Sequence, residues 1–394
     1  MNIKKTIKET VNKKVVITEA RGIAESTIPY THASINEIDK QIDYYFKNIF
    51  KNKKYLKSVE DMRVGGYLPA PDYSTKIIIP YRTLAKYIDD DIFEDFPVVT
   101  LNITLKFIYI NEESGTNDNF GVGGGAWPIF KGKSTTLSQS IKPEGFPVSK
   151  VRRESIDRAV IGELEFDFNF YKNFSSKRNY KNFHREVRAV IFHEMMHLYE
   201  SYKDKSSQVH TIHKGVKSKK PKSKGSAGKA YLTDTKLLGI PNEVNEVMKL
   251  VYHMYYVSLP TEVKAITHEM YPYVLDMSIP QFFKSYQGKR VKGLMEFDAD
   301  DYYEQLEMAV GEYLTKIGKA PNEEVINSFL EQVRMRTLKK YKRSATDNHE
   351  FVDEKLIKQK SMRSLLHYMG KQINNGGQRL FRNVGRLYSL KSEL

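Results

Sequence analysis

The sequence predicts an α+β fold in which a sheet is followed by a long series of helices. Two segments indicate strands, because apolar and polar residues alternate along Leu101–Ile110 and along Glu163–Phe170. From about Asp298 to the end, the chain has the pattern of successive helices. We therefore expect a sheet in the first half of the chain and a helical second half.

Local patterns predict the elements around the sheet. Ser34 is a suitable N-cap for a helix from Ile35 to Phe50, Val15–Thr18 is a short strand-like run, and Ile77–Ile79 indicates another strand. Residues 119–128 contain four glycines and lead to Trp127, the only tryptophan. No Gly-Lys-Ser/Thr follows, so a phosphate-binding loop is excluded, and we interpret this segment as a turn near a cleft rim.

Helices are predicted after the sheet. The first is expected from His184 to Lys203, with Asn182 as its N-cap. Two later helices are expected to open at Pro241–Glu246, running to Tyr256, and at Leu259–Ala265. Another starts at Asp298 and extends over Tyr302–Ile317. The last candidates are Glu323–Tyr341, Phe351–Lys371 and Gln378–Ser389. Four segments follow: an N-terminal basic segment (1–75), the sheet and first helix (76–235), a helical half (236–297) and a C-terminal helical region (298–394).

Two histidines four residues apart, His193 and His197, enclose the sequence Glu-Met-Met. On a helix, this spacing brings both imidazoles to one face, one turn apart, where they could bind a single zinc ion. Glu194 would then lie beside the metal without ligating it, and could take a proton from a zinc-bound water. An apolar stripe supports the helix; its members are Val187, Ile191, Met195, Leu198 and Tyr202.

This His-Glu-x-x-His pattern, preceded by the alternating strand Glu163–Phe170, resembles the zincin catalytic domain of zinc metallopeptidases. The resemblance covers roughly residues 95–275. It implies a twisted sheet, mostly antiparallel at its edge, whose edge strand lines the substrate cleft, an active-site helix behind it, and a helical half that supplies a third ligand. It also implies a peptidase acting on protein or peptide substrates, with Glu194 as general base.

The third ligand must come from a later segment. Position 200 is Glu and position 203 is Lys, so the metzincin pattern is excluded. Glu200 itself lies about 10 Å along the helix from His193, too far to close a tetrahedron. Glu262 is expected, because its Glu-x-x-Ala setting resembles the third-ligand helix of gluzincins. The alternatives left open are Glu243, Glu246, His253 and His268, and the candidates for an oxyanion donor are Tyr252, Tyr255, Tyr256 and Tyr271.

Composition sets further limits. The chain has no cysteine, so disulfides and thiolate ligands are excluded, and it has neither a long apolar run nor a hydrophobic signal core. We therefore expect a cytoplasmic or virion-associated protein, and the Lys/Asn/Tyr/Ile-rich composition resembles proteins of AT-rich bacteria and their phages.

The net charge is +15, and a basic loop, Lys214–Lys229, is expected to flank the cleft and to attract polyanions or acidic partners. Two alternatives to a peptidase follow from these features. One is a structural or virion-associated protein with an idle zincin domain, and the other is a basic nucleic-acid-associated protein.

Overall fold

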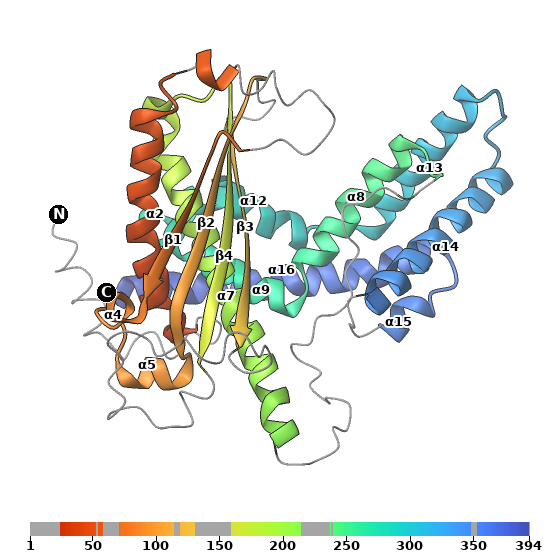
Figure 1. Ribbon diagram of the computed structural model, residues 1–394. Coiled ribbons are helices and arrows are strands. Elements are labelled where there is room, and N and C mark those ends of the chain that lie inside the picture. The colour runs from red at the N-terminus through yellow and green to blue at the C-terminus, as the bar shows by residue number, and fades with distance from the viewer. Residues whose placement is uncertain are drawn as a thin grey trace. The chain divides into compact units, whose positions relative to one another are not determined.

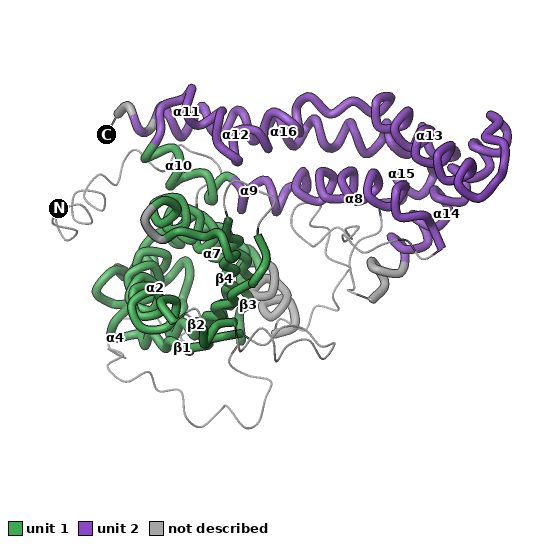
Figure 2. The backbone as a smooth tube through the Cα atoms, turned by 90° about the horizontal axis from the view of Figure 1, so that it is seen from above, with its two compact units in different colours: residues 1–218, 267–276, 393–394 green, residues 219–266, 277–392 purple. Residues whose placement is uncertain are grey.

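The computed structural model describes residues 24–52, 54–57, 71–113, 119–130, 159–213, 237, 239–347 and 353–393. The chain divides into two compact units, coloured separately in Figure 2. Unit 1 comprises residues 1–218, 267–276 and 393–394, and unit 2 comprises residues 219–266 and 277–392. The strands all belong to unit 1, whereas the described elements of unit 2 are helical, so the α+β class is confirmed. The division into four sequence segments stays a prediction.

Unit 1 is built on a four-stranded mixed sheet in the order β1-β2-β4-β3 (Figure 1). The strands are β1 (Tyr73–Pro80), β2 (Val98–Ile110), β3 (Phe120–Phe130) and β4 (Val160–Tyr171). β2 and β4 are parallel, and the outer strands β1 and β3 each pair antiparallel with their neighbour. The predicted strands at 77–79, 101–110 and 163–170 are therefore confirmed.

The alternation predicted for β4 is present, since its residues are alternately buried and partly exposed. Leu164, Phe166, Phe168 and Phe170 are at most 1% exposed. They face the same side as the buried residues of β2, where helices α2 (Ile28–Asn48) and α7 (Ser176–His213) cover the sheet (Figure 1). Stacked and edge-to-face rings fill this core, among them Tyr45 against Phe107 at a centroid distance of 4.4 Å.

The glycine-rich segment is a strand, so the predicted turn is wrong. β3 contains Gly121, Gly123, Gly124 and Gly125, and it occupies the edge of the sheet beside β4. Close packing explains at least one of these glycines: a Cβ built on Gly124 would lie 2.7 Å from Cγ of Glu194 and 3.0 Å from Val190 of α7. The edge strand nearest the His-Glu-x-x-His helix is therefore β3, and β4 is an interior strand.

Two helices of unit 1 begin earlier than predicted. α2 starts at Ile28, so Ser34 lies within the helix, where its hydroxyl donates to the carbonyl of Tyr30 rather than capping an end. α7 starts at Ser176, so Asn182 is also an interior residue. Both predicted caps were wrong because a polar residue that suits a cap also fits inside a helix. The remaining helical elements of this unit are η1 (Glu25–Thr27), α4 (Tyr81–Leu84), α5 (Asp90–Asp95) and α10 (Tyr271–Asp276).

Unit 2 contains most of the later helices. They are α8 (Asn242–Val257), α11 (Ile279–Lys284), α12 (Tyr286–Met295), α13 (Ala299–Lys316), α14 (Glu323–Asp347), α15 (Glu354–Ile357) and α16 (Met362–Glu393). Asp298 caps α13 as predicted, since its side chain accepts from the N–H of Asp300. Helix α9 (Pro260–Glu269) begins in unit 2 and ends in unit 1.

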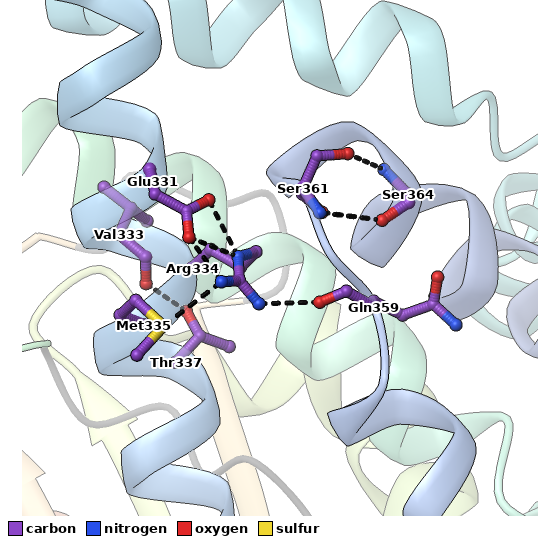
Figure 3. A network of polar contacts seen from close by, with 8 residues as sticks. All are labelled: Glu331, Val333, Arg334, Met335, Thr337, Gln359, Ser361 and Ser364. Carbon is purple, nitrogen blue, oxygen red and sulfur yellow. Dashed lines mark hydrogen bonds and ion pairs between the residues drawn. The ribbon is translucent and has the colours of Figure 1, made fainter.

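The predicted break between residues 371 and 378 is absent, because α16 continues through Gly376 and Gly377. A Cβ on Gly376 would lie 2.6 Å from Cβ of Ser258, and one on Gly377 would lie 2.8 Å from the backbone of Leu294. These glycines therefore permit close helix packing instead of ending the helix. The helix begins at Met362. A reciprocal pair of hydrogen bonds between Ser361, which precedes it, and Ser364, in its first turn, caps this end (Figure 3).

The predicted strand at Val15–Thr18 and the basic loop Lys214–Lys229 lie outside the described residues. Among the helices that are described, none is both long and apolar enough to cross a membrane.

Candidate metal centre

Helix α7 presents His193, Glu194 and His197 in a fixed orientation. The predicted apolar stripe, Val187 to Tyr202, is confirmed, since each of its five residues is at most 2% exposed. Burial of this stripe against the sheet sets the rotation of the helix about its axis. The two histidines therefore lie one turn apart on a partly exposed flank.

The two imidazoles turn the same ring nitrogen toward one point. Nε2 of His193 and Nε2 of His197 are 3.0 Å apart, while Nδ1 of His193 donates to Oε2 of Glu269 at 2.9 Å. A carboxylate can only accept here, so in the neutral imidazole the ring proton of His193 is on Nδ1 and Nε2 presents a lone pair. Metal-binding histidines commonly have such a carboxylate behind them, which fixes the tautomer.

Glu262 completes a group of three candidate ligands. One atom from each of His193, His197 and Glu262 can be chosen so that all three lie within 4.8 Å of one another. Glu262 is 5% exposed, and the hydroxyl of Tyr256 donates to its Oε1 at 2.7 Å. This hydrogen bond joins the last turn of α8 to the first turn of α9 and holds the carboxylate in one orientation.

Helix α9 carries both of the glutamates that approach His193 and His197. Glu262 and Glu269 are seven residues apart, which is two turns, so they lie on the same face of this continuous helix. Ala265, between them in sequence, is fully buried. One helix thus supplies a candidate ligand and the carboxylate that orients His193.

Glu194 is close to the sheet edge. Its side chain is only 7% exposed, and the space above Gly124 of β3 is filled by its Cγ. Any other residue at position 124 would displace either this side chain or the strand. A buried carboxylate next to two candidate ligands is the arrangement expected of a general base at a metal-bound water.

The alternative ligands lie elsewhere. Glu243 forms an ion pair with Lys316, Glu246 and His253 are exposed, and Nε2 of the buried His268 accepts from the backbone N–H of Ala24 at 2.8 Å. Glu200 does not belong to the group either, as the helix geometry predicts.

Among the four tyrosines left open as oxyanion donors, Tyr256 alone has a described hydrogen bond to a candidate ligand. The hydroxyl of Tyr252 pairs with Thr337, and the ring of Tyr271 packs against Phe192. Burial raises the pKa of Tyr252, Tyr255 and Tyr271, so all three remain protonated at neutral pH.

Sequence reasoning missed Glu269 and Gly124. Glu269 could have been found from its spacing, because a carboxylate seven residues after a candidate ligand occupies the same helix face two turns on. Gly124 gave no such signal, since its role depends on the approach of β3 to α7, and those two elements are far apart in the sequence.

The donor set suits zinc. Two neutral imidazoles and one carboxylate are the ligands of one common class of catalytic zinc site, in which the fourth position is left for water. The carboxylate behind His193 and the tyrosine behind Glu262 provide the outer hydrogen bonds that such sites use.

No protein-family model, curated protein or solved structure matches this chain. The chemistry of the group formed by His193, His197 and Glu262 is therefore the basis for assigning a function.

Proposed function

We propose that this chain is a zinc-dependent peptidase that hydrolyses a peptide bond with a metal-activated water. The observation that carries this function is the convergence of candidate ligand atoms from His193, His197 and Glu262 within 4.8 Å, next to the buried Glu194. Convergence alone is compatible with a purely structural metal. The adjacent carboxylate, which is not one of the three ligands, favours catalysis over that alternative.

Each residue of the candidate metal centre has a distinct part in this reaction. His193, His197 and Glu262 would hold the ion, and a bound zinc ion would lower the pKa of water and polarise a carbonyl. Glu194 accepts a proton from the water and passes it to the leaving amine. Glu269 keeps the lone pair of His193 Nε2 directed at the site, and Tyr256 keeps Glu262 in place.

The substrate would lie along β3. In the described sheet this strand pairs with β4 on one side only, so its other side offers backbone N–H and C=O groups to an extended peptide. Gly124 brings β3 against Glu194, so a peptide paired with this edge would pass the proposed general base.

Zinc stoichiometry and peptide cleavage test this function together. Wild-type protein should contain one equivalent of zinc and cleave members of a peptide library. His193→Ala and Glu262→Ala should lose both properties, whereas Glu194→Gln should keep the zinc and lose cleavage. The matched control is Glu246→Gln, which alters an exposed carboxylate outside the group and should change neither.

Two results would contradict the proposal at different points. Full zinc in Glu262→Ala would show that the third ligand is wrong. A fully zinc-loaded wild type that cleaves no peptide would refute the peptidase and leave a structural protein with an idle metal site.

A further inference from the structure

Three helices of unit 2 carry cations with almost no acidic residues to balance them. Together α11, α12 and α16 contain ten lysines and arginines and a single glutamate, Glu393. Helix α13 of the same unit has the opposite composition, with five acidic residues and one lysine. This separation shows that the excess of positive charge is not spread evenly, as it would be if it served only solubility.

Four of these cations form an exposed row along α16: Lys371, Arg379, Arg382 and Arg386. The three arginines follow at steps of three and four, so they share one face, and the row from Lys371 to Arg386 is about 22 Å long. None of the four has an acidic partner among the described ion pairs. The opposite face of the helix is anchored, because Leu380, Val384 and Leu387 are at most 3% exposed.

The same helix carries an exposed aromatic ring, about 100° around its axis from Arg382. Phe381 is 46% exposed although it is a large apolar side chain, and its ring centroid is 5.8 Å from that of Phe283 on α11. The ammonium of Lys292, from α12, is 5.8 Å from the Phe283 ring. Phe381 therefore follows Arg382 around the helix, and a lysine from α12 approaches the ring that Phe381 contacts. We call Lys292, Lys371, Arg379, Phe381, Arg382 and Arg386 the cationic surface.

The start of α16 is rigidly held, which favours a preformed surface. Arg334 of α14 forms an ion pair with Glu331 and donates at 2.6 Å to the carbonyl of Gln359, just before the Ser361–Ser364 cap (Figure 3). A partner that binds the row would not need to order this helix first.

The charge of this surface requires a polyanionic partner, and its other features distinguish between two kinds. An amphipathic helix binds a bilayer by inserting its apolar face, but the apolar face of α16 is buried in the protein. Guanidinium groups instead match phosphate oxygens in a bidentate geometry. A half-exposed aromatic ring on the adjoining side of the same helix can stack on an unpaired base, which a duplex does not offer.

We propose that the cationic surface binds single-stranded nucleic acid, with Arg379, Arg382 and Arg386 on successive phosphates and a base stacked on Phe381. This binding is separate from the metal centre, and it does not depend on the proposed peptidase activity.

Fluorescence anisotropy with the full chain and a labelled oligothymidylate of about 20 nucleotides tests the proposal. Arg379→Gln/Arg382→Gln/Arg386→Gln should weaken binding at least tenfold. It should also lower the salt dependence, the slope of log K against log[salt], by about 2, because each phosphate contact on a single strand contributes about 0.7. Phe381→Ala should weaken binding about tenfold without changing that slope, because stacking releases no counterions.

A matched control removes the same charge from the same unit. Lys249, Lys319 and Lys339 are exposed and lie outside the cationic surface, so Lys249→Gln/Lys319→Gln/Lys339→Gln should bind as the wild type does. Equal weakening by both triple variants would overturn the proposal, because it would indicate a general charge effect. Thermal melting of each variant checks that it is folded, and Arg382→Gln/Arg386→Gln is a milder second variant.

Three further outcomes would overturn the proposal. If removal of residues 217–224 abolished binding and the arginine variants did not weaken it, the basic loop would be the site. Equal affinity for a duplex of the same length would refute stacking on Phe381. Binding to phosphatidylserine vesicles in sedimentation, without binding to the oligonucleotide, would assign the surface to a membrane.

Discussion

Both ring nitrogens of His193 have a close neighbour. One of these neighbours, Glu269, is not a candidate ligand, yet the metal affinity is expected to depend on it. Nδ1 of His193 donates to Glu269, which is 6% exposed, and its Nε2 faces His197. Loss of an outer carboxylate of this type commonly weakens metal binding by about 10- to 100-fold.

We therefore expect Glu269→Gln to weaken zinc binding by about 10- to 100-fold, because a neutral amide oxygen accepts the N–H of His193 Nδ1 less strongly than a carboxylate does. Competition with a zinc chelator measures the affinity. Glu243→Gln is the control, since its carboxylate pairs with Lys316 instead. Unchanged affinity in Glu269→Gln would show that the hydrogen bond does not orient the ligand.

His32 of α2 is expected to make the stability of unit 1 depend on pH. Burial lowers the pKa of His32 below its usual 6.5, and the charge of Arg188 lowers it further. At a pH between 6.5 and the lowered pKa of the folded chain, His32 is protonated in the unfolded chain but not in the folded one, so the unfolded chain binds more protons. The contribution of His32 is therefore complete above pH 6.5 and declines as the pH falls toward the lowered value.

Urea unfolding above and below pH 6.5 checks this sign. The free energy of unfolding should fall less on acidification in His32→Gln than in the wild type. His253→Gln, which changes an exposed histidine, should behave as the wild type does. An equal fall in all three proteins would mean that His32 titrates alike in the folded and unfolded chain.

At the scale of elements, β3 and α7 are fitted to each other at one residue. A Cβ at position 124 would meet Glu194, Val190 and Phe166, whereas one at position 123 would meet nothing within 4 Å. Gly124→Ala should lower the free energy of unfolding by about 1–3 kcal/mol through overpacking. Gly123→Ala is the matched control and should stay within about 1 kcal/mol of the wild type in the same denaturant titration. Equal free energies of unfolding in the two variants would show that β3 moves away from α7 without loss of stability.

The glycines of α16 provide a second pair on one helix. Gly376→Ala should destabilise unit 2 by about 1–3 kcal/mol, because the new Cβ would lie 2.6 Å from Ser258. Gly385→Ala meets nothing within 4 Å and should stabilise the helix by about 0.5–1 kcal/mol, since alanine loses less backbone entropy. Opposite shifts in melting temperature are the expected result, and two shifts of the same sign would contradict it.

These elements also show what the sequence could and could not predict. The strands β2 and β4 and the stripe on α7 were predictable because their periodicity follows from burial on one face, which each segment encodes by itself. Gly124 fell in a predicted turn and Gly376 in the predicted break between two helices, yet both occupy close contacts with a distant segment. Glu269 acts on His193 across 76 residues, so the histidine motif by itself could not reveal it, and only its spacing from Glu262 pointed to it.

At the scale of the whole molecule, three buried glutamates lie at the candidate metal centre of a chain that is basic overall. The chain carries +15 overall, but Glu194, Glu262 and Glu269 are each at most 7% exposed and are associated with two histidines. Buried carboxylates are costly unless they are paired or coordinate a cation. A zinc ion would therefore stabilise the folded chain as well as supply its proposed chemistry.

Removal of zinc should consequently lower the melting temperature. His197 and Glu262 are 65 residues apart, so the unfolded chain does not hold them together, and zinc at 100 times its dissociation constant adds about 2.7 kcal/mol to the stability of the folded form. In a chain of 394 residues, with an unfolding entropy of about 2.1 cal/mol/K per residue, that corresponds to a rise of roughly 3 °C over protein treated with EDTA. Glu194→Gln keeps the ligands and should show the same rise, whereas His193→Ala should show almost none. Melting temperatures in the wild type that are equal with zinc and with EDTA would refute a metal bound by this group, because binding to the folded form alone must stabilise it.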